Sequence, residues 1–297
     1  MTRQPKVRQV MLLAARAALV SQAIFEFGNA SITEEDMMLL ETKAAIIYGG
    51  GGAIGSAVAR AYAREGAQVF LAGRTIKALD EVARTIRSTG GTAEVAQVDA
   101  LDRAAVEKHA SAVADAAGGI DIAFNATSND DVQGTPLLDM PYEDFMRPVT
   151  KAVTTQFVTA TAVARHMKHR GSGAILVMAG GREAIPSLGG AHVAWTALAG
   201  LCRQLACELG PHGIRVAWLL SPGSPGAAPG AGHEGERPRS PHYQLRHDDV
   251  DPDAAVTMLH RRPTLNEVAN VAVFLASDWA RTMTATEVNI TAGAVVD

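Results

Sequence analysis

From residue 44 to the C-terminus, short runs of apolar residues alternate with longer segments in which apolar residues recur every three or four positions. The runs predict strands buried on both faces, and the longer period predicts amphipathic helices. Their alternation predicts an α/β fold with a doubly wound parallel sheet. The predicted strands are Ala44–Tyr48, Ala67–Ala72, Thr92–Val98, Ile120–Asn125, Ala174–Met178, Ile214–Leu220 and Glu287–Ile290. The predicted helices are Ile54–Glu65, Ile76–Ser88, Arg103–Ala117, Tyr142–His169, Gly190–Leu209 and Thr264–Ser277.

Residues 1–37 precede this pattern and are expected to form a separate N-terminal helical extension to a domain of residues 38–297. Lys6–Phe27 is apolar and rich in alanine, with basic residues but no acidic residue before Glu26. Such a segment is typical of a targeting peptide, of an added helix that packs on the domain or its partner, or of an adventitious leader before Met38. Arg16 divides the apolar run, which argues against a transmembrane span.

A second exception to the pattern is the segment 222–262, which is rich in proline and glycine at its start and strongly polar afterwards. We expect a flexible, lid-like loop here. Three aspartates at alternate positions from Asp249 resemble the start of a calcium loop. The match then fails, because Ala254 stands where the loop requires glycine and His260 where it requires glutamate. No metal site is expected.

Composition agrees with a folded enzyme-sized domain. The chain has 297 residues, of which 47% are apolar and 20% charged, so it can bury a large core. A net charge of −4 gives no reason to expect binding to nucleic acid or to a membrane surface. The only cysteines, Cys202 and Cys207, lie too far apart on one predicted helix to form a disulfide comfortably. Free thiols suit a reducing compartment, and we expect a cytoplasmic protein.

The first predicted strand runs directly into the glycine run Gly49–Gly52 and then, after Ile54 and Gly55, into a helix. Without Cβ atoms the turn lets backbone approach a pyrophosphate, and the helix N-terminus offers free N–H groups to it. This order of strand, turn and helix predicts a dinucleotide site of the Rossmann type. The alternative is a flexible glycine turn that binds no ligand.

The residue that follows the second strand indicates which dinucleotide is bound. An acidic residue there selects the ribose 2′-hydroxyl of NAD. Here the strand is followed by Gly73 and Arg74, and no acid is present. The guanidinium of Arg74 can pair with a 2′-phosphate, which favours NADP, unless it is simply a surface arginine.

Together these motifs resemble the classical short-chain dehydrogenase/reductase family over about residues 39–297. The family pattern T-G-x-x-x-G-I-G appears as Tyr48–Gly55, with a phenol at Tyr48 as a departure. The pattern N-N-A-G appears as Phe124–Thr127, where Thr127 adds a branched side chain. The resemblance implies a seven-stranded sheet in three α/β/α layers. The expected cofactor-binding residues combine the glycine turn and Arg74 with those that the resemblance implies. They are Gly49, Gly51, Gly52, Ile54, Gly55, Arg74, Asp99, Asn125 and Gly223.

The same resemblance points to an altered catalytic centre. The family protonates its substrate with a tyrosine, assisted by a lysine four residues later, a serine after the fifth strand and an asparagine on the preceding helix. Counting along this chain, the residues at these four positions are Ala191, Trp195, Ala179 or Gly180, and Ala152. None of them transfers a proton, so no catalytic residue is assigned from the family.

Other polar residues near the expected pocket offer weaker substitutes. His192 titrates in a suitable range, but it lies about 100° around the helix from the tyrosine position. Asp130 and Asp131 lie on a loop at the expected pocket mouth. Arg182 and Glu183 could bind or polarise a ligand, and a simple ion pair at the rim is the alternative.

Three functions are compatible with these residues. The first is an NADP-binding oxidoreductase with divergent chemistry acting on a small molecule. The second is a non-redox enzyme on the same scaffold, such as a cyclase, dehydratase or isomerase. The third is a catalytically inactive subunit or binding module that pairs with an active homologue. The resemblance also implies a homodimer or homotetramer assembled through the predicted helices within 142–169 and 190–209.

Overall fold

A computed structural model describes residues 38–182, 184–221 and 257–296. The chain divides into two units, Met1–Met38 and Leu39–Asp297, and the second contains nearly all of the described residues. The predicted extension 1–37 lies outside the described residues. So does most of the predicted loop 222–262, including Gly223.

The seven-stranded parallel sheet predicted from the sequence is confirmed. Its order is β3-β2-β1-β4-β5-β6-β7, and every neighbouring pair is parallel. The order reverses between β1 and β4, which is where ligands bind in doubly wound sheets. The strands are β1 (Ala44–Tyr48), β2 (Gln68–Gly73), β3 (Thr92–Gln97), β4 (Ile122–Asn125), β5 (Gly173–Ala179), β6 (Ile214–Leu220) and β7 (Thr286–Asn289).

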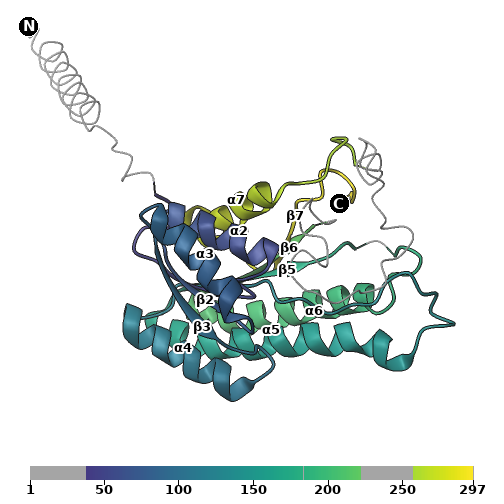
Figure 1. Ribbon diagram of the computed structural model, residues 1–297, viewed down its shortest axis with the longest axis horizontal. Helices are drawn as coiled ribbons and strands as arrows, with labels where there is room; N and C mark the ends of the chain where they lie inside the picture. Colours follow the sequence, from purple (N-terminus) through teal and green to yellow (C-terminus); the bar gives the residue numbers. More distant parts are fainter. Residues whose placement is uncertain (1–37, 183, 222–256, 297) are drawn as a thin grey trace, which may run out of the picture. The chain divides into compact units, whose positions relative to one another are not determined.

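Helices cover both faces of the sheet (Figure 1). On one face α2, α3 and α7 pack against the first buried cluster, and on the other α4, α5 and α6 pack against the second. The helices are α2 (Ala53–Arg64), α3 (Ile76–Ser88), α4 (Arg103–Ala117), α5 (Tyr142–Arg170), α6 (Ala191–Leu209) and α7 (Leu265–Ala276), with short 3₁₀ turns η2 (Gly210–His212) and η5 (Asp278–Ala280).

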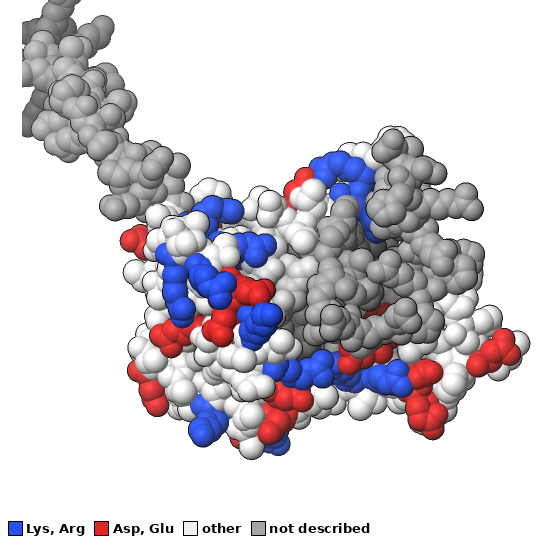
Figure 2. Space-filling model, in the orientation of Figure 1, with Lys and Arg blue, Asp and Glu red and all other residues white. Residues whose placement is uncertain are grey.

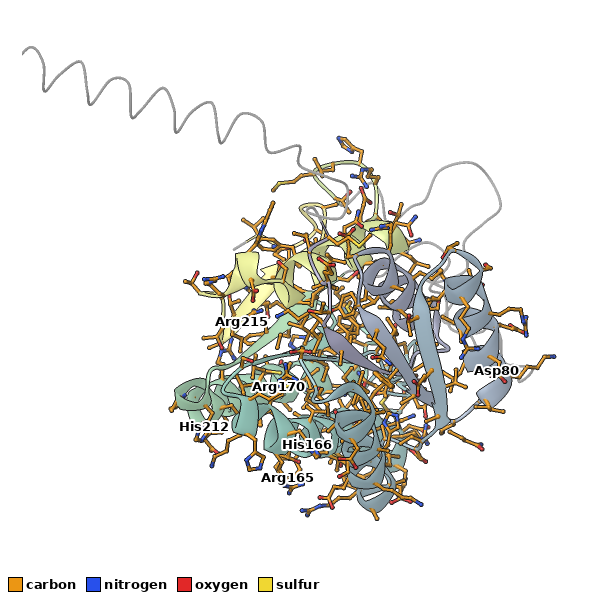
Figure 3. The ribbon with its side chains drawn as sticks, turned by 90° about the vertical axis from the view of Figure 1, so that its left-hand side faces the viewer. Asp80, Arg165, His166, Arg170, His212 and Arg215 are labelled. Carbon is orange, nitrogen blue, oxygen red and sulfur yellow. The ribbon has the colours of Figure 1, made fainter. Side chains whose placement is uncertain are left out.

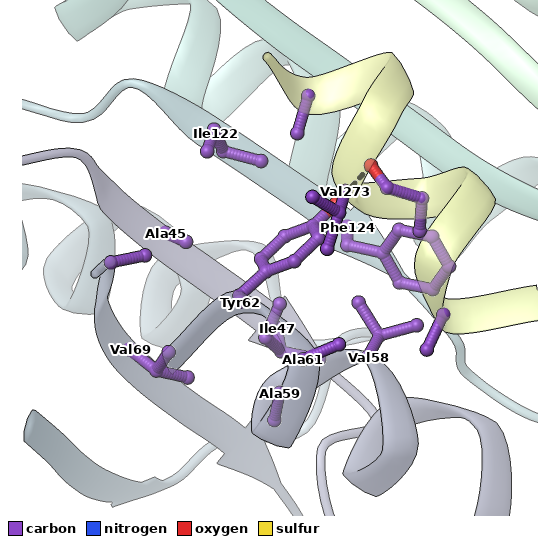
Figure 4. Packing of buried hydrophobic residues seen from close by; sticks show 14 of the residues in the cluster. Ala45, Ile47, Val58, Ala59, Ala61, Tyr62, Val69, Ile122, Phe124 and Val273 are labelled. Carbon is purple, nitrogen blue, oxygen red and sulfur yellow. Dashed lines mark hydrogen bonds between the residues drawn. The ribbon is translucent and has the colours of Figure 1, made fainter. Parts of the chain in front are cut away.

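The core explains why the strands read as continuous apolar runs. All five residues of β1 are buried, because helices cover the strand on both sides. Tyr62 of α2 is fully buried beside Phe124 of β4, in an edge-on arrangement with ring centroids 6.4 Å apart (Figure 4). Its hydroxyl donates to the carbonyl oxygen of Ala272 at 3.2 Å, which ties α2 to α7. Since this phenol is buried, its pKa is raised above the usual range.

Basic side chains at the amino end of the sheet are used to join elements (Figure 3). Arg170 of α5 pairs with Asp121, just before β4, at 3.2 Å and donates to the carbonyl oxygen of Gly118. Arg215 of β6 donates to the carbonyl oxygens of Met283, Ala276 and Ser277. These residues therefore stabilise the packing of the helices and strands. The polar groups that remain for ligand binding lie at the carboxyl end of the sheet.

The observed element boundaries differ little from the predicted ones. The largest difference is at β4, whose pairing with β1 begins at Ile122, two residues later than the sequence predicts. Residues 257–262, which the sequence places in the flexible loop, instead form a hydrogen-bonded turn. The Thr257 hydroxyl donates to the carbonyl oxygen of Arg261 and accepts from its N–H. Among the helices described, none is both long and apolar enough to cross a membrane.

Candidate functional site

The glycine turn lies at the carboxyl end of β1, between the ends of β2 and β4. Both Gly49 and Gly50 donate their N–H groups to the carbonyl oxygen of Ala72, at 2.8 and 3.2 Å. Gly49 has φ of 77°, and a Cβ atom there would lie 2.6 Å from the carbonyl oxygen of Ala126. Only glycine fits this conformation in this space.

The turn presents backbone to a ligand at the start of α2. Gly55 packs so closely on the turn that a Cβ atom would lie 2.3 Å from the carbonyl oxygen of Gly49, while Gly51 and Gly52 are exposed. No side chain caps α2 at Gly52, and its first turn carries no acidic residue. The free N–H groups and the positive end of the helix dipole therefore suit an anion such as a pyrophosphate. Ile54 anchors this first turn against the core.

Arg74 and Asp99 are brought to the same edge, beyond β2 and β3. Gly73 pairs with Gln97, whose side-chain amide donates to the Arg74 carbonyl oxygen at 2.9 Å. The Arg74 side chain is exposed, and none of the described residues pairs with its guanidinium. Asp99 is also exposed, and one of its carboxylate oxygens accepts from the N–H of Leu101 at 3.0 Å. A Cβ atom on Gly51 would lie 3.0 Å from the Cβ of Ala78, at the start of the helix that Arg74 precedes, so the turn and the two charged residues line one edge.

Asn125 lies at the end of β4 on the other side of the turn, and its side chain is used within the protein. Its amide nitrogen donates to Gln156 at 3.0 Å, and its oxygen accepts from the N–H and the hydroxyl of Thr127. The Thr127 hydroxyl also contacts that of Thr155 at 3.1 Å. Thr127 is thus held by this buried network. The sequence analysis did not identify Thr155 and Gln156 as partners of Asn125 and Thr127. Two adjacent polar residues on a buried helix are nevertheless a sign of an internal hydrogen-bond network.

The four positions implied for catalysis are occupied by a packed apolar arrangement. The indole of Trp195 lies directly on Gly180, where a Cβ atom would be 2.1 Å from Cε2 of the indole. Gly180 and Ala179 are buried, and Ala152 and Ala191 are 2% and 1% exposed. The tryptophan therefore fills the space above the end of β5, and no side chain at these positions carries a titratable group.

Other charged residues at this end are paired with protein partners. Lys151 of α5 forms an ion pair with Asp130, and the exposures of the two side chains are 12% and 22%. The sequence identified Asp130 but not Lys151. Asp131 accepts from the side chain of Gln133 at 2.6 Å.

Arg182 forms an ion pair with Glu287 of β7 at 2.5 Å, whereas its suggested partner Glu183 lies outside the described residues. The other oxygen of Glu287 accepts from the buried indole N–H of Trp218 at 2.7 Å. His192 is partly buried, and its Nδ1 has no hydrogen-bond partner within the described part of the chain. Among the described residues, no cluster of three or more His, Cys, Asp or Glu residues is arranged to hold a metal.

Tyr48 turns away from the glycine turn rather than bracing it. Its ring packs edge-on against His109 of α4, with centroids 6.2 Å apart, and its buried hydroxyl has no partner among the described residues. Burial raises the pKa of the Tyr48 phenol above its usual range and lowers that of the His109 imidazole. The phenol is therefore a part of the core on the α4 side of the sheet.

The face shown in Figure 2 carries basic and acidic side chains mixed over the region of α3 and α4. A surface of mixed sign lacks the continuous positive field that guides proteins to nucleic acid.

Comparison with known proteins finds relatives over most of the chain. The sequence profile of the family described as Enoyl-(Acyl carrier protein) reductase matches residues 51–294. The L-rhamnose 1-dehydrogenase (NAD(P)(+)) of Azotobacter vinelandii is 31% identical over 277 residues, which cover 88% of this chain and 99% of that protein.

Solved structures show the same fold. A short-chain type dehydrogenase/reductase from Mycobacterium marinum is 29% identical and superposes with a TM-score of 0.74, covering 88% of this chain and 98% of that one. An NAD⁺-bound xylitol dehydrogenase is 26% identical, also with a TM-score of 0.74, and covers 86% and 99% of the two chains. The similarity extends over nearly the whole length of these proteins.

Proposed function

Because the chain belongs to the short-chain dehydrogenase/reductase family, we propose that it is an oxidoreductase that binds NADP(H) and acts on a small molecule through an atypical active site. We further propose that it works as a cytoplasmic homodimer or homotetramer, in which α5 and α6, which pack on each other, form the contact between subunits.

The observation that carries the proposal is the exposed glycine turn at the uncapped start of α2, beside the unpaired guanidinium of Arg74. The turn suits the pyrophosphate, and Arg74 suits a 2′-phosphate, with which it makes strong charge-assisted hydrogen bonds. Asp99 lies at the same edge, where the adenosine is expected. Gly223, which completes the proposed set, lies outside the described residues.

The choice of NADP over NAD rests on Arg74 alone. The rhamnose dehydrogenase is described with either nucleotide and the xylitol dehydrogenase is bound to NAD⁺, so these two relatives do not decide between NAD and NADP. In this chain an arginine stands where NAD selection requires an acid, and its side chain is free to turn toward a phosphate. We therefore assign the 2′-phosphate to Arg74.

The nicotinamide supplies a hydride when it is bound, and the protein's part is to position the substrate and supply a proton. A positioned acid contributes roughly 10²–10⁴ to the rate and an oriented hydrogen-bond donor roughly 10²–10³. Ala191 and Gly180 supply neither, so ordinary carbonyl reduction should be slow. The proton must come from another group or from the substrate itself.

The test is NADPH consumption by the full chain against a panel of small aldehydes, ketones and sugars. The proposal predicts slow but measurable turnover that Arg74→Asp abolishes, because the substitution replaces attraction to the 2′-phosphate with repulsion. Arg84→Asp is the matched control, since Arg84 is an exposed arginine on α3 and the net charge changes equally. Turnover of a ligand without NADPH oxidation would overturn the redox assignment.

A further inference from the structure

The indole of Trp195 covers the end of β5, and Gly180 makes this contact available. A Cβ atom on Gly180 would lie 2.1 Å from Cε2 and 2.3 Å from both Cδ2 and Cζ2 of the indole, so the ring lies flat on the backbone of the glycine. Real Cβ contacts do not approach so closely. The ring therefore fills the volume that any side chain at Gly180 would occupy.

This contact lies on one side of the glycine turn only. β4 separates the end of β1 from β5, with Asn125 beside Tyr48 on one edge and beside Val177 on the other. A dinucleotide bound across the point where strand order reverses extends from the turn in both directions. One half would lie over β2 and β3, and the other half would lie over β4 and β5, on the side where Trp195 covers the end of β5.

The two sides differ in the groups they offer. Over β2 and β3 the guanidinium of Arg74 is exposed without a partner among the described residues, and Asp99 has one carboxylate oxygen in use. Over β4 and β5 the side chains of Asn125 and Thr127 bond each other, and Lys151 is paired with Asp130. Polar groups already satisfied inside a protein add little to the binding of a ligand.

We propose that this chain recognises the adenosine 2′-phosphate half of its nucleotide and that Trp195 excludes the other half from a close fit. The ligand class is the 2′-phosphorylated adenosine nucleotides, with or without nicotinamide. This inference rests on the proposed nucleotide binding and states which half of the nucleotide carries the affinity. It also agrees with the slow carbonyl reduction that the proposed function expects.

The experiment compares adenosine 2′,5′-bisphosphate with NADPH by isothermal titration calorimetry on the full chain. The inference predicts dissociation constants within about threefold of each other, because the described residues offer the second half of NADPH few contacts. NADPH binding about 30-fold or more tighter than the bisphosphate would overturn the inference and leave the proposed function intact. If neither ligand binds, both fall.

Trp195→Ala supplies an independent arm of the test. Opening the end of β5 should tighten NADPH binding about tenfold and leave the bisphosphate within about twofold. Trp279→Ala is the control, because Trp279 in η5 is 76% exposed, and it should change neither constant. Weaker NADPH binding by folded Trp195→Ala would show that the indole grips the second half, which would contradict the inference. The comparison of adenosine 2′,5′-bisphosphate with NADPH uses the unaltered chain, so it tests the inference even if Trp195→Ala does not fold.

Discussion

At the scale of single residues, the indole of Trp195 lies where a side chain at Gly180 would lie, so the two positions depend on each other. Counting along the family motifs placed Trp195 at the lysine position and Ala179 or Gly180 at the serine position. It could not show that Trp195 and Gly180 touch, since their contact depends on how α6 packs against the end of β5. The same limit applies to Lys151, whose partner Asp130 lies on a distant loop.

Restoring a serine at position 180 tests this dependence. Gly180→Ser should destabilise the chain by about 1–3 kcal/mol, because the new Cβ must displace the indole from a packed site. In a Trp195→Ala background the cost should largely disappear, giving a coupling energy of about 1 kcal/mol or more in urea unfolding. Gly181→Ser is the control, since a Cβ atom there would meet nothing within 4 Å. Equal costs of Gly180→Ser in both backgrounds would refute the dependence.

At the scale of elements, most of the fold was predictable because the inner strands are largely buried on both faces and each helix on one. The edge strands β3 and β7 are only partly buried. Glycines add a second signal, as Gly118 and Gly171 end α4 and α5 in the left-handed conformation. The first and last residues of an element are harder to predict, since the pairing of β4 with β1 decides where β4 begins. The turn 257–262 was missed because its hydrogen bonds come from one polar side chain, Thr257.

The glycine turn predicts a difference between two substitutions with similar backbone cost. Gly49 and Gly90 have φ of 77° and 87°, but only at Gly49 does a Cβ meet backbone atoms. Gly49→Ala should therefore cost about 1–3 kcal/mol more than Gly90→Ala in thermal or urea unfolding, and it alone should weaken nucleotide binding. The same loss of stability in both variants would mean that strain at positive φ is the whole effect.

The start of α7 predicts an acid-dependent loss of stability. Glu267 accepts from Arg261 and from both the N–H and the hydroxyl of Thr264, which holds the pKa of its carboxyl at about 2 instead of 4.5. Because the folded state binds the proton more weakly, this contribution is complete above about pH 4.5 and is lost as the pH falls toward 2.

Glu267→Gln should therefore lower stability at pH 7 and flatten its decline between pH 4.5 and pH 2, as measured by urea unfolding at each pH. Glu81→Gln, on the exposed side of α3, is the control. A variant whose stability falls with acid as steeply as that of the parent would show that the capping contact contributes nothing.

At the scale of the whole molecule, family membership and fold agree, and the atypical catalytic centre is the part that we propose. The doubly wound sheet is present from β1 to β7. The departures from the family pattern that the sequence predicts include Tyr48 and Thr127 as well as Ala191 and Trp195. The sequence predicted the glycine turn but not the contact between Trp195 and Gly180, because backbone turns follow local sequence and side-chain packing does not.

The division of the chain at Leu39 gives a prediction for the fold as a unit. A chain beginning at Met38 should unfold at the same temperature as the full chain, within about 2 °C, because among the described residues the buried core begins at Leu40. Differential scanning calorimetry measures this directly. A clear drop in the unfolding temperature would instead assign a packing role to residues 1–37.

The central claim is that Arg74 and the glycine turn make an NADP(H) site, and direct titration of NADPH and NADH into the full chain tests it. NADPH should bind at least about tenfold more tightly than NADH, and Arg74→Asp should remove that preference while Arg84→Asp retains it. Equal binding of the two nucleotides, or binding of neither at millimolar concentration, would contradict the claim.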